Sequence, residues 1–365
     1  MNLRLEKIKK ILQENDIDCI ALVPGSNFRF ITGGNFALME RPTVLFITKD
    51  KMPLAVLPTL EVDSFKNLNF EADIIDWQDS NGYQDAFDKA ERKIGNLKKI
   101  GVEGQRIRFF ETLAIKKSFK FSELIDSNKL IMSCRICKDE NEILSLKKAI
   151  DISENSLSNV LKQIEENISE LEIKNLLIQD MFKNGAHDLP FSPLVLISEN
   201  SALPHGHSQH KNKLKKGDPL LIDFGCSVDG YNSDITRTFF FKDVKDEYEK
   251  IYNSVLKANK IGIDILKPDV TMHQIDDIVL NSLSESGYEN LIVHKTGHGL
   301  GLDVHEEPYV MRNNNQKLKE GMIITIEPGL YDIGNIGVRI EDDVLITKDG
   351  YKCLTEFSKK IKIIE

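Results

Sequence analysis

Five polar residues interrupt strand-like, apolar segments in which a globular protein normally buries hydrocarbon side chains. They are Asp223, Asp234, His298, Glu327 and Glu341. Four carboxylates converging with one imidazole would repel one another unless a positive charge lay between them. Carboxylate oxygen and imidazole nitrogen are suitable ligands for hard and borderline divalent ions. The five residues therefore predict two divalent metal ions in a hydrolase, provided that the fold brings their side chains together.

Asp223 and Asp234 are expected on the two strands of one hairpin. The run 220–228 is strand-like, and Asp229-Gly230 is a strong signal for a two-residue turn. A tight turn predicts three cross-strand pairs: Val228 with Tyr231, Gly225 with Asp234, and Asp223 with Thr236. Strand alternation then places both aspartates on one face, about 7–8 Å apart at the backbone, with open space beside the glycine. A surface hairpin with two solvated aspartates is the alternative.

Glu327 and Glu341 interrupt two further apolar runs, 323–326 and 337–346. A hairpin centred near Gly334-Asn335 would place Glu327 opposite Glu341, with Arg339 on the same face as Glu341. Burying such a glutamate without a partner would cost several kcal/mol, so metal ligation or an ion pair is required. Arg339 can supply one ion pair, but it cannot neutralise four acids.

The stretch 294–308 contains His294, His298 and His305, three of the eight histidines of the chain. Its glycines let the backbone approach closely around His298. The Gly-His-Gly-Leu-Gly run lacks the spacing and the Lys-Ser/Thr pair of a phosphate-binding loop. A further element, 200–205, ends in His205, and the polar stretch that follows it is typical of a solvated loop.

Together these segments resemble the pita-bread metallopeptidases, in particular the Xaa-Pro aminopeptidase and prolidase branch. Six motifs occur in the family order across residues 195–347, and their joint presence is highly specific. They are Asn-Ser-Ala-Leu-Pro-His (200–205), Leu-Ile-Asp-Phe-Gly (221–225), Tyr-Asn-Ser-Asp-Ile-Thr-Arg-Thr (231–238), Thr-Gly-His-Gly-Leu-Gly-Leu-Asp-Val-His-Glu (296–306), Ile-Glu-Pro-Gly-Leu-Tyr (326–331) and Gly-Val-Arg-Ile-Glu-Asp (337–342).

The resemblance assigns a role to each residue of the predicted site. It implies that the metal ligands are Asp223, Asp234, His298, Glu327 and Glu341. It implies that His205, His294 and His305 contact the substrate and the transition state, although the loop before Asp223 leaves open whether His205 or His207 enters the site. Arg339 and Thr236 are expected to orient the ligating carboxylates. Tyr231 either joins them or packs in the core.

The ligand set favours Mn²⁺, with Co²⁺, Fe²⁺ or Zn²⁺ as alternatives. Two ions sharing a water would lower its pKa and hold a hydroxide beside the scissile carbonyl. Glu327 is expected to accept the proton of that water and pass it to the leaving proline nitrogen. His294 and His305 are expected to hydrogen-bond the oxyanion or the substrate backbone. The predicted function is hydrolysis of Xaa-Pro bonds in dipeptides or at the N-terminus of peptides, by a protein that the resemblance implies is a homodimer.

Other functions are known for this fold, because fold alone does not fix chemistry. Methionine aminopeptidase shares the ligand set but usually lacks a large N-terminal domain. A non-catalytic binding module would usually have lost ligands, and a metal-independent amidinohydrolase of the creatinase type should lack the carboxylate and histidine set. A small lyase stays an alternative. Within the Xaa-Pro branch, the sequence does not separate dipeptidase from aminopeptidase.

A chain of 365 residues is long enough for two domains. An opening amphipathic helix and strand-like runs at 19–23, 43–48, 54–57, 72–75 and 100–102 predict an α/β N-terminal domain over residues 1–135. The α+β pita-bread catalytic domain would occupy residues 136–365, with helical patterns over 138–185, 245–266 and 273–284. Residues 27–33 resemble a family segment that approaches the active site, often that of the partner subunit, and a strand end with a turn is the alternative.

Composition excludes several classes of function. A net charge of −9 argues against nucleic-acid binding as the main role. No apolar run approaches the length of a membrane span, and the N-terminus lacks a signal-peptide core. The odd number of cysteines, five, indicates a reducing cytoplasm. Cys134 and Cys137 form a Cys-x-x-Cys motif, but no second pair completes a zinc site.

Overall fold

The computed structural model describes residues 3–365 of the chain. The contacts divide the protein into two compact units, Met1–Arg135 and Ile136–Glu365, which we call the N-terminal and C-terminal units. Between Leu3 and Glu365, no helix is both long enough and apolar enough to cross a lipid bilayer.

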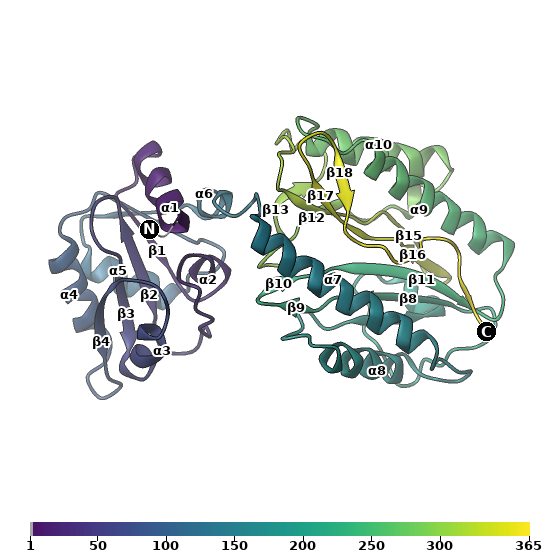
Figure 1. The fold of residues 1–365 in the computed structure, drawn as a ribbon, viewed down its shortest axis with the longest axis horizontal. Coiled ribbons are helices and arrows are strands. Elements are labelled where there is room, and N and C mark those ends of the chain that lie inside the picture. Colours follow the sequence, from purple (N-terminus) through teal and green to yellow (C-terminus); the bar gives the residue numbers. More distant parts are fainter. Residues whose placement is uncertain (1–2) are drawn as a thin grey trace. The chain divides into compact units, whose positions relative to one another are not determined.

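The N-terminal unit is built on one mixed six-stranded sheet (Figure 1). The strand order is β4-β3-β2-β1-β5-β6, and β1 pairs antiparallel with β2 and parallel with β5. The strands are β1 (Cys19–Leu22), β2 (Val44–Thr48), β3 (Leu54–Pro58), β4 (Asp73–Trp77), β5 (Lys99–Val102) and β6 (Glu123–Asp126). The helices are α1 (Leu3–Glu14), α2 (Ser26–Thr32), α3 (Val62–Lys66), α4 (Gln84–Ile94), α5 (Phe109–Ser118) and α6 (Asn128–Ser133), with a 3-10 turn, η1 (Thr59–Glu61).

The sequence predicted the opening helix and the first five of these strands, but it missed β6, a short edge strand with exposed ends. The interpretation of residues 27–33 as a strand end and turn is wrong, because they form most of helix α2. Phe28 and Ile31, three positions apart, are both buried, as a helical period requires. Asn27 donates to Glu103 at 2.8 Å and so ties the start of the helix to the loop after β5. Gly33, in the left-handed region at φ 78°, ends it.

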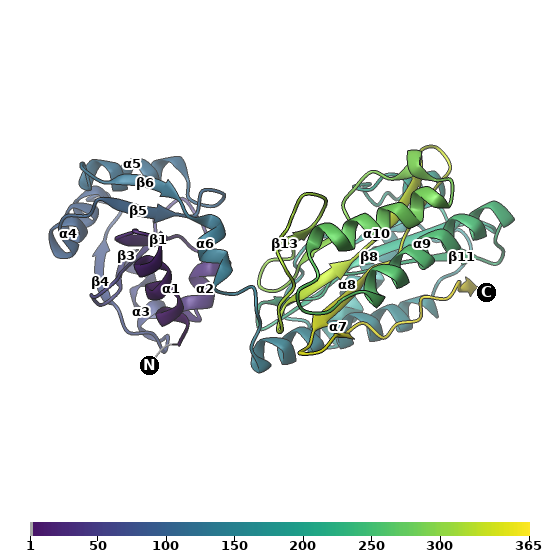
Figure 2. The same cartoon turned by 90° about the horizontal axis from the view of Figure 1, so that it is seen from above.

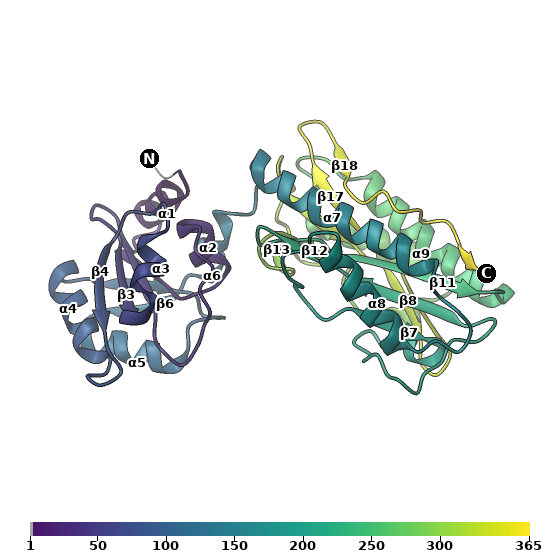
Figure 3. The same cartoon turned by 60° about the horizontal axis from the view of Figure 1, so that its bottom comes forward.

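In the C-terminal unit, the strands lie between two pairs of helices, α7 with α8 on one side and α9 with α10 on the other (Figure 1). Figure 2 shows α9 and α10 side by side, and Figure 3 shows α8 beside β7. The helices are α7 (Glu140–Leu161), α8 (Glu170–Lys183), α9 (Asp246–Asp264) and α10 (Met272–Glu285), with 3-10 turns η2 (Ser198–Ala202) and η3 (Glu289–Leu291).

The strands of the C-terminal unit form two larger sheets, β19-β11-β8-β7 and β13-β12-β14-β17-β18, and two short ribbons, β10-β9 and β15-β16. They are β7 (Leu194–Ile197), β8 (Pro219–Phe224), β9 (Ser227–Val228), β10 (Tyr231–Asn232), β11 (Ile235–Phe241), β12 (Gly297–Gly299), β13 (Glu306–Val310), β14 (Ile323–Ile326), β15 (Gly329–Asp332), β16 (Ile336–Arg339), β17 (Asp342–Ile346), β18 (Tyr351–Cys353) and β19 (Ile363–Ile364). Leu157 of α7 and Leu177 of α8 share one apolar core with Ile222 of β8. Val255 of α9 and Val338 of β16 share another.

The helical pattern predicted over 138–185 is two helices, since α7 ends at Leu161 and α8 begins at Glu170. The expected start near Asp139 is confirmed, because the Asp139 carboxylate accepts from the Glu142 amide at 3.0 Å and the Glu142 carboxylate accepts from the Asp139 amide at 2.8 Å. A second capping box, formed by Ser169 and Glu172, opens α8. This capping box was the sequence signal that one helix ends and another begins between Leu161 and Glu170.

Both predicted hairpin registers are confirmed. In the first, Val228 pairs with Tyr231 and Asp223 with Thr236. In the second, the pairs Ile326 with Asp342 and Gly329 with Arg339 continue one register, which sets Glu327 opposite Glu341. The expected open space beside Gly225 is wrong. A Cβ atom there would lie 1.9 Å from the carbonyl oxygen of Ser233, so the glycine permits close approach of the two strands.

This close approach predicts a stability cost for a single methyl group. We expect Gly225→Ala to lower the free energy of unfolding by about 1–3 kcal/mol, because the added carbon overlaps backbone that cannot rotate away. Urea denaturation measures the change. Gly350→Ala is the matched control, since nothing lies within 4 Å of a Cβ at that position. Equal stabilities of the two variants would contradict the prediction.

Candidate metal centre

The five predicted ligands lie within strands or directly beside them. Asp223 is in β8, Asp234 precedes β11, and His298 is the middle residue of β12. Glu327 follows β14, and Glu341 lies between β16 and β17. The side chains of Asp234 and His298 are only 6% and 1% exposed, and those of Asp223 and Glu327 only 14% and 16% exposed. The two hairpins therefore present their acids to the interior.

The structure brings all five side chains together. Ligand atoms of Asp223, Asp234 and Glu341 lie within 4.8 Å of one another, and so do those of His298, Glu327 and Glu341. His298 Nε2 lies 3.4 Å from Glu327 Oε1 and 3.7 Å from Asp234 Oδ2. Glu341 belongs to both groups, so it lies between two adjacent places where a cation could bind.

A third group of possible ligands includes a residue that the sequence placed only with the substrate. Ligand atoms of Asp234, His298 and His305 also lie within 4.8 Å of one another. The His298 and His305 rings lie 4.1 Å apart between centroids. The imidazole of His305 is thus close enough to the centre for metal binding as well as substrate binding.

The hydrogen bond of its second ring nitrogen orients His298 for ligation. Its Nδ1 lies 3.1 Å from the carbonyl oxygen of Gly299, which can only accept, so the proton is on Nδ1. The Nε2 lone pair therefore points at the acids. Burial, and secondarily the neighbouring His305, lowers the pKa of His298 to about 3. The ring is neutral near pH 7, as a metal ligand must be.

Two of the acids have one oxygen held by the protein and one without a partner. Asp223 Oδ2 accepts from Arg339, and Glu341 Oε2 accepts from the Thr236 hydroxyl at 2.7 Å. Asp223 Oδ1 and Glu341 Oε1 are buried and have no hydrogen-bond partner. Unsatisfied buried carboxylate oxygens are costly, and a bound cation would satisfy them. The donor set therefore fits divalent metal ions.

The acids also perturb one another. Burial, and then repulsion from Glu341, raises the pKa of Asp234 and of Glu327 well above their ordinary values. Burial, followed by the charge of Asp223, raises the pKa of Glu341 to about 7. Burial raises the pKa of Asp223 as well, although Arg339 opposes the rise. A divalent cation would reverse these shifts by favouring the ionised forms.

Arg339 connects the acids to His294 through Tyr331, which the sequence analysis did not single out. The Arg339 guanidinium donates to Asp223, to Thr236 Oγ1 at 3.0 Å and to the Tyr331 hydroxyl at 2.6 Å. That hydroxyl lies 2.9 Å from His294 Nε2, while His294 Nδ1 lies 2.7 Å from the Lys295 carbonyl oxygen. Both ring nitrogens of His294 are therefore engaged. Burial, and then Arg339, lowers its pKa to about 4.

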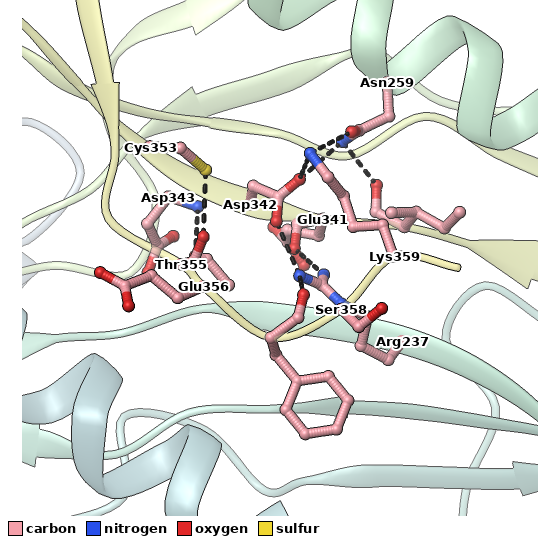
Figure 4. Close-up of polar contacts among 12 residues, drawn as sticks. Arg237, Asn259, Glu341, Asp342, Asp343, Cys353, Thr355, Glu356, Ser358 and Lys359 are labelled. Carbon is pink, nitrogen blue, oxygen red and sulfur yellow. Dashed lines mark hydrogen bonds and ion pairs between the residues drawn. The ribbon is translucent and has the colours of Figure 1, made fainter. Parts of the chain in front are cut away.

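A second buried ion pair supports the backbone of Glu341 (Figure 4). Arg237 of β11 donates to the Glu341 carbonyl oxygen and, at 2.7 Å, to Asp342. Lys359 and Asn259 reach the other Asp342 oxygen at 2.9 Å and 3.1 Å. Burial alone would raise the pKa of Asp342, but Arg237 and Lys359 lower it. The position of Glu341 thus depends on helix α9 and on the C-terminal segment near Lys359.

Asp343 is a further buried acid beside the centre. Its Oδ2 accepts from the Asp234 backbone amide at 3.2 Å. Its own amide donates to the Thr355 hydroxyl at 2.9 Å (Figure 4). Sequence reasoning missed Asp343, Arg237 and Asp342, although all three lie within the motifs 231–238 and 337–342 or directly beside them. A charged residue in an apolar run was the only available signal.

The remaining predicted residues are placed as follows. The His205 imidazole lies close enough to the centre to contribute to the pKa shifts of Asp223, His294 and His305, and it is exposed. His207 is exposed as well, and its carbonyl accepts from Asn200 at 3.1 Å. The geometry therefore favours His205 over His207. The Tyr231 hydroxyl donates to Glu142 at 2.6 Å and its ring belongs to an apolar core, which favours the packing alternative.

Comparisons with known proteins agree with this geometry. Residues 145–348 match the model of metallopeptidase family M24, and residues 4–137 match the creatinase/prolidase N-terminal domain. The chain belongs to metallopeptidase family M24. An uncharacterized peptidase of Staphylococcus epidermidis is 33% identical over 356 residues, which cover 98% of this chain and 99% of the relative.

Two solved structures of the family superpose over nearly the whole chain. A prolidase from Thermococcus sibiricus has a TM-score of 0.93 and 32% identity, covering 99% of this chain and 98% of its own. An X-Pro aminopeptidase from Thermotoga maritima has a TM-score of 0.86 and 28% identity, covering 99% of both chains. The predicted fold class, an α/β N-terminal domain followed by a pita-bread catalytic domain, is confirmed. So is the prediction that the protein is a metallopeptidase, and the family implies divalent metal ions.

The raised pKa of Glu341 predicts how metal affinity of this M24 peptidase depends on pH. Below about pH 7 the Glu341 carboxyl of the metal-free protein holds a proton that a cation must displace. For each proton that binding releases, affinity for Mn²⁺ should therefore fall about tenfold per pH unit as the pH drops below 7. His298 does not contribute, because its pKa is about 3. Calorimetric titration in buffers of different ionisation enthalpy counts the protons. Binding without proton release at pH 6 would contradict the prediction.

Proposed function

We propose that this M24 peptidase hydrolyses the bond between an N-terminal residue and proline, with Xaa-Pro dipeptides as its first substrate class. The observation that carries the proposal is the convergence of four carboxylates and His298 beside three further histidines. The superposition on a prolidase along nearly the full chain supports the dipeptide. The similarity to an X-Pro aminopeptidase supports the second candidate, release of the first residue from longer Xaa-Pro peptides.

We propose that Asp223, Asp234, His298, Glu327 and Glu341 hold two divalent ions, with Mn²⁺ as the first choice and Co²⁺, Fe²⁺ or Zn²⁺ as alternatives. The two adjacent ligand groups that share Glu341, and the unpartnered oxygens of Asp223 and Glu341, support two ions over one. When bound, the ions would supply Lewis-acid activation of a water molecule and of the scissile carbonyl.

Glu327 is proposed as the group that moves the proton. Its side chain is 16% exposed, slightly more than those of Asp223 and Asp234, and so can reach water and substrate. It would accept a proton from the attacking water and deliver it to the proline nitrogen. That nitrogen is tertiary in the substrate and leaves as an amine only if it is protonated.

His205, His294 and His305 are proposed to bind the substrate and the oxyanion that develops on its carbonyl. His305 and His205 are exposed and can turn a ring N–H toward a bound peptide. His294 can do so only by exchanging its contact with the Tyr331 hydroxyl, because both its nitrogens are engaged. Arg339 and Thr236 are proposed to orient Asp223 and Glu341, with which they share hydrogen bonds.

Three features of the whole protein are also proposed. The domains are taken as residues 1–135 and 136–365, which the division of contacts between Arg135 and Ile136 supports. A cytoplasmic location is supported by the odd number of cysteines, five. The homodimer rests on the family resemblance alone.

Substrate length is tested by comparing an Xaa-Pro dipeptide with an Xaa-Pro-Yaa tripeptide under saturating Mn²⁺. We expect the dipeptide to be cleaved with the higher kcat/KM, since the chain is prolidase-like in fold. Release of free Xaa, the product common to all the substrates, is followed by chromatography, and an Xaa-Ala dipeptide is the control for the proline requirement. Faster cleavage of the tripeptide would support the aminopeptidase, and cleavage of neither Xaa-Pro substrate would overturn the proposal.

Replacing Glu327 by glutamine removes the proton acceptor and keeps the size of the side chain. We expect Glu327→Gln to lower kcat by about 10²–10⁴-fold, the usual contribution of general acid–base catalysis. Metal content is measured in parallel, because the residue is also a proposed ligand. A variant with full metal content and wild-type turnover would remove Glu327 from the proton role.

A further inference from the structure

Glu170, the first residue of α8, carries a fully buried carboxylate that receives five hydrogen bonds. Its Oε1 accepts from the Ile197 amide at 2.7 Å and from Asn200 Nδ2 at 2.8 Å. Its Oε2 accepts from the Gln209 amide at 2.7 Å, from Asn212 Nδ2 at 2.9 Å and from Asn200 Nδ2 at 3.0 Å. Every donor is an N–H group, so both oxygens act as acceptors, which is the pattern of an ionised carboxylate.

These donors lie on both sides of His205 in the sequence. Ile197 and Asn200 precede it, and Gln209 and Asn212 follow it. Between them, the Gly206 amide donates to the Leu203 carbonyl at 2.9 Å and closes a turn that exposes His205. Asn200 Nδ2 also reaches the His207 carbonyl at 3.1 Å. One carboxylate thus holds the two ends of the segment that presents this imidazole.

Other contacts also hold parts of this segment: the Gly337 amide donates to Ser201 Oγ at 2.8 Å, and the Val195 amide donates to Ser208 Oγ at 3.0 Å. Between the end of β7 at Ile197 and the start of β8 at Pro219, the only helical or strand element is the short 3-10 turn η2. Side-chain hydrogen bonds must therefore replace the backbone ladder that would hold a strand. Glu170 is well suited to that task, because it extends from the first turn of a helix whose Leu177 and Met181 are buried in the core.

We propose that Glu170 is a positioning residue for His205: by fixing residues 197–200 and 209–212 together, it sets where the imidazole meets the substrate. The proposal rests on the proposed function, in which His205 contacts the substrate. Glu170 itself touches no reacting group and acts only through the segment.

The variant Glu170→Gln tests this with almost no change in size. The glutamine amide nitrogen can only donate, so either Gln209 and Asn212 or Ile197 and Asn200 would face another donor. Glu172→Gln is the matched control. Glu172 lies in the same turn of α8, but its carboxylate accepts from Ser169 and from Lys213 at the surface.

The first measurement is hydrogen exchange followed by mass spectrometry, which needs no activity. We expect Glu170→Gln to speed exchange in peptides covering residues 196–212, while Glu172→Gln leaves them unchanged and α7, α9 and α10 stay protected in both. Unchanged exchange over residues 196–212 in Glu170→Gln would overturn the proposal whatever the substrate proves to be.

The second measurement is a double-mutant cycle on kcat/KM for an Xaa-Pro dipeptide. We expect Glu170→Gln and His205→Ala each to lower kcat/KM by about 10–100-fold, as misplacing or removing a substrate contact does. The double variant should match His205→Ala within about twofold, because Glu170 acts through His205. Multiplied losses would overturn the positioning role. An unchanged His205→Ala variant would instead overturn the substrate role of His205, and wild-type protein inactive on both the Xaa-Pro dipeptide and the Xaa-Pro-Yaa tripeptide would overturn the proposed function.

Discussion

The repulsion among four buried carboxylates is the constraint on which the rest of the C-terminal unit depends. Each carboxylate loses hydration on burial, and each neighbouring charge adds to the cost of ionising it. Arg339 offsets part of this for Asp223, and Thr236 satisfies one oxygen of Glu341. The raised pKa values of Asp234, Glu327 and Glu341 reflect the part of this ionisation cost that the protein does not offset. The fold therefore holds the acids close together at a cost that a bound cation can repay.

Two hairpins supply the rigidity that this crowding requires. Each follows a pair of helices in the chain, α7 and α8 before Asp223 and Asp234, α9 and α10 before Glu327 and Glu341. A tight turn fixes the register of the hairpin that carries Asp223 and Asp234. In the hairpin that carries Glu327 and Glu341, the β14–β17 and β15–β16 pairings share one register. A slip by one residue would turn every acid to the opposite face. The equivalence of the two halves is visible in the order of elements, although the sequence shows no repeat.

Local rules were enough to predict the parts of the site whose partners are near in sequence. The turn at Asp229-Gly230 fixed the pairing of Asp223 with Thr236, and the centre near Gly334 fixed Glu327 opposite Glu341. The missed residues have distant partners: Arg237 with Asp342, Tyr331 with His294, and Glu170 with the segment 197–212. A buried charge in a sequence shows that a partner is needed, but it does not say which one. The interpretation of residues 27–33 as a strand end and turn was wrong for a different reason: the contact of Asn27 with Glu103 helps to fix a helix there.

The arrangement of donors explains how Arg339 can neutralise Asp223 without displacing a metal ion. Arg339 takes only Oδ2 of Asp223, and Thr236 takes only Oε2 of Glu341, so each carboxylate keeps one oxygen free. The protein orients each ligand through one oxygen and leaves the other for the cation. A guanidinium in a rigid fork suits this task better than a flexible ammonium, since its direction is fixed by the Tyr331 hydroxyl and Thr236. Orientation and ligation thus use different atoms of the same acids.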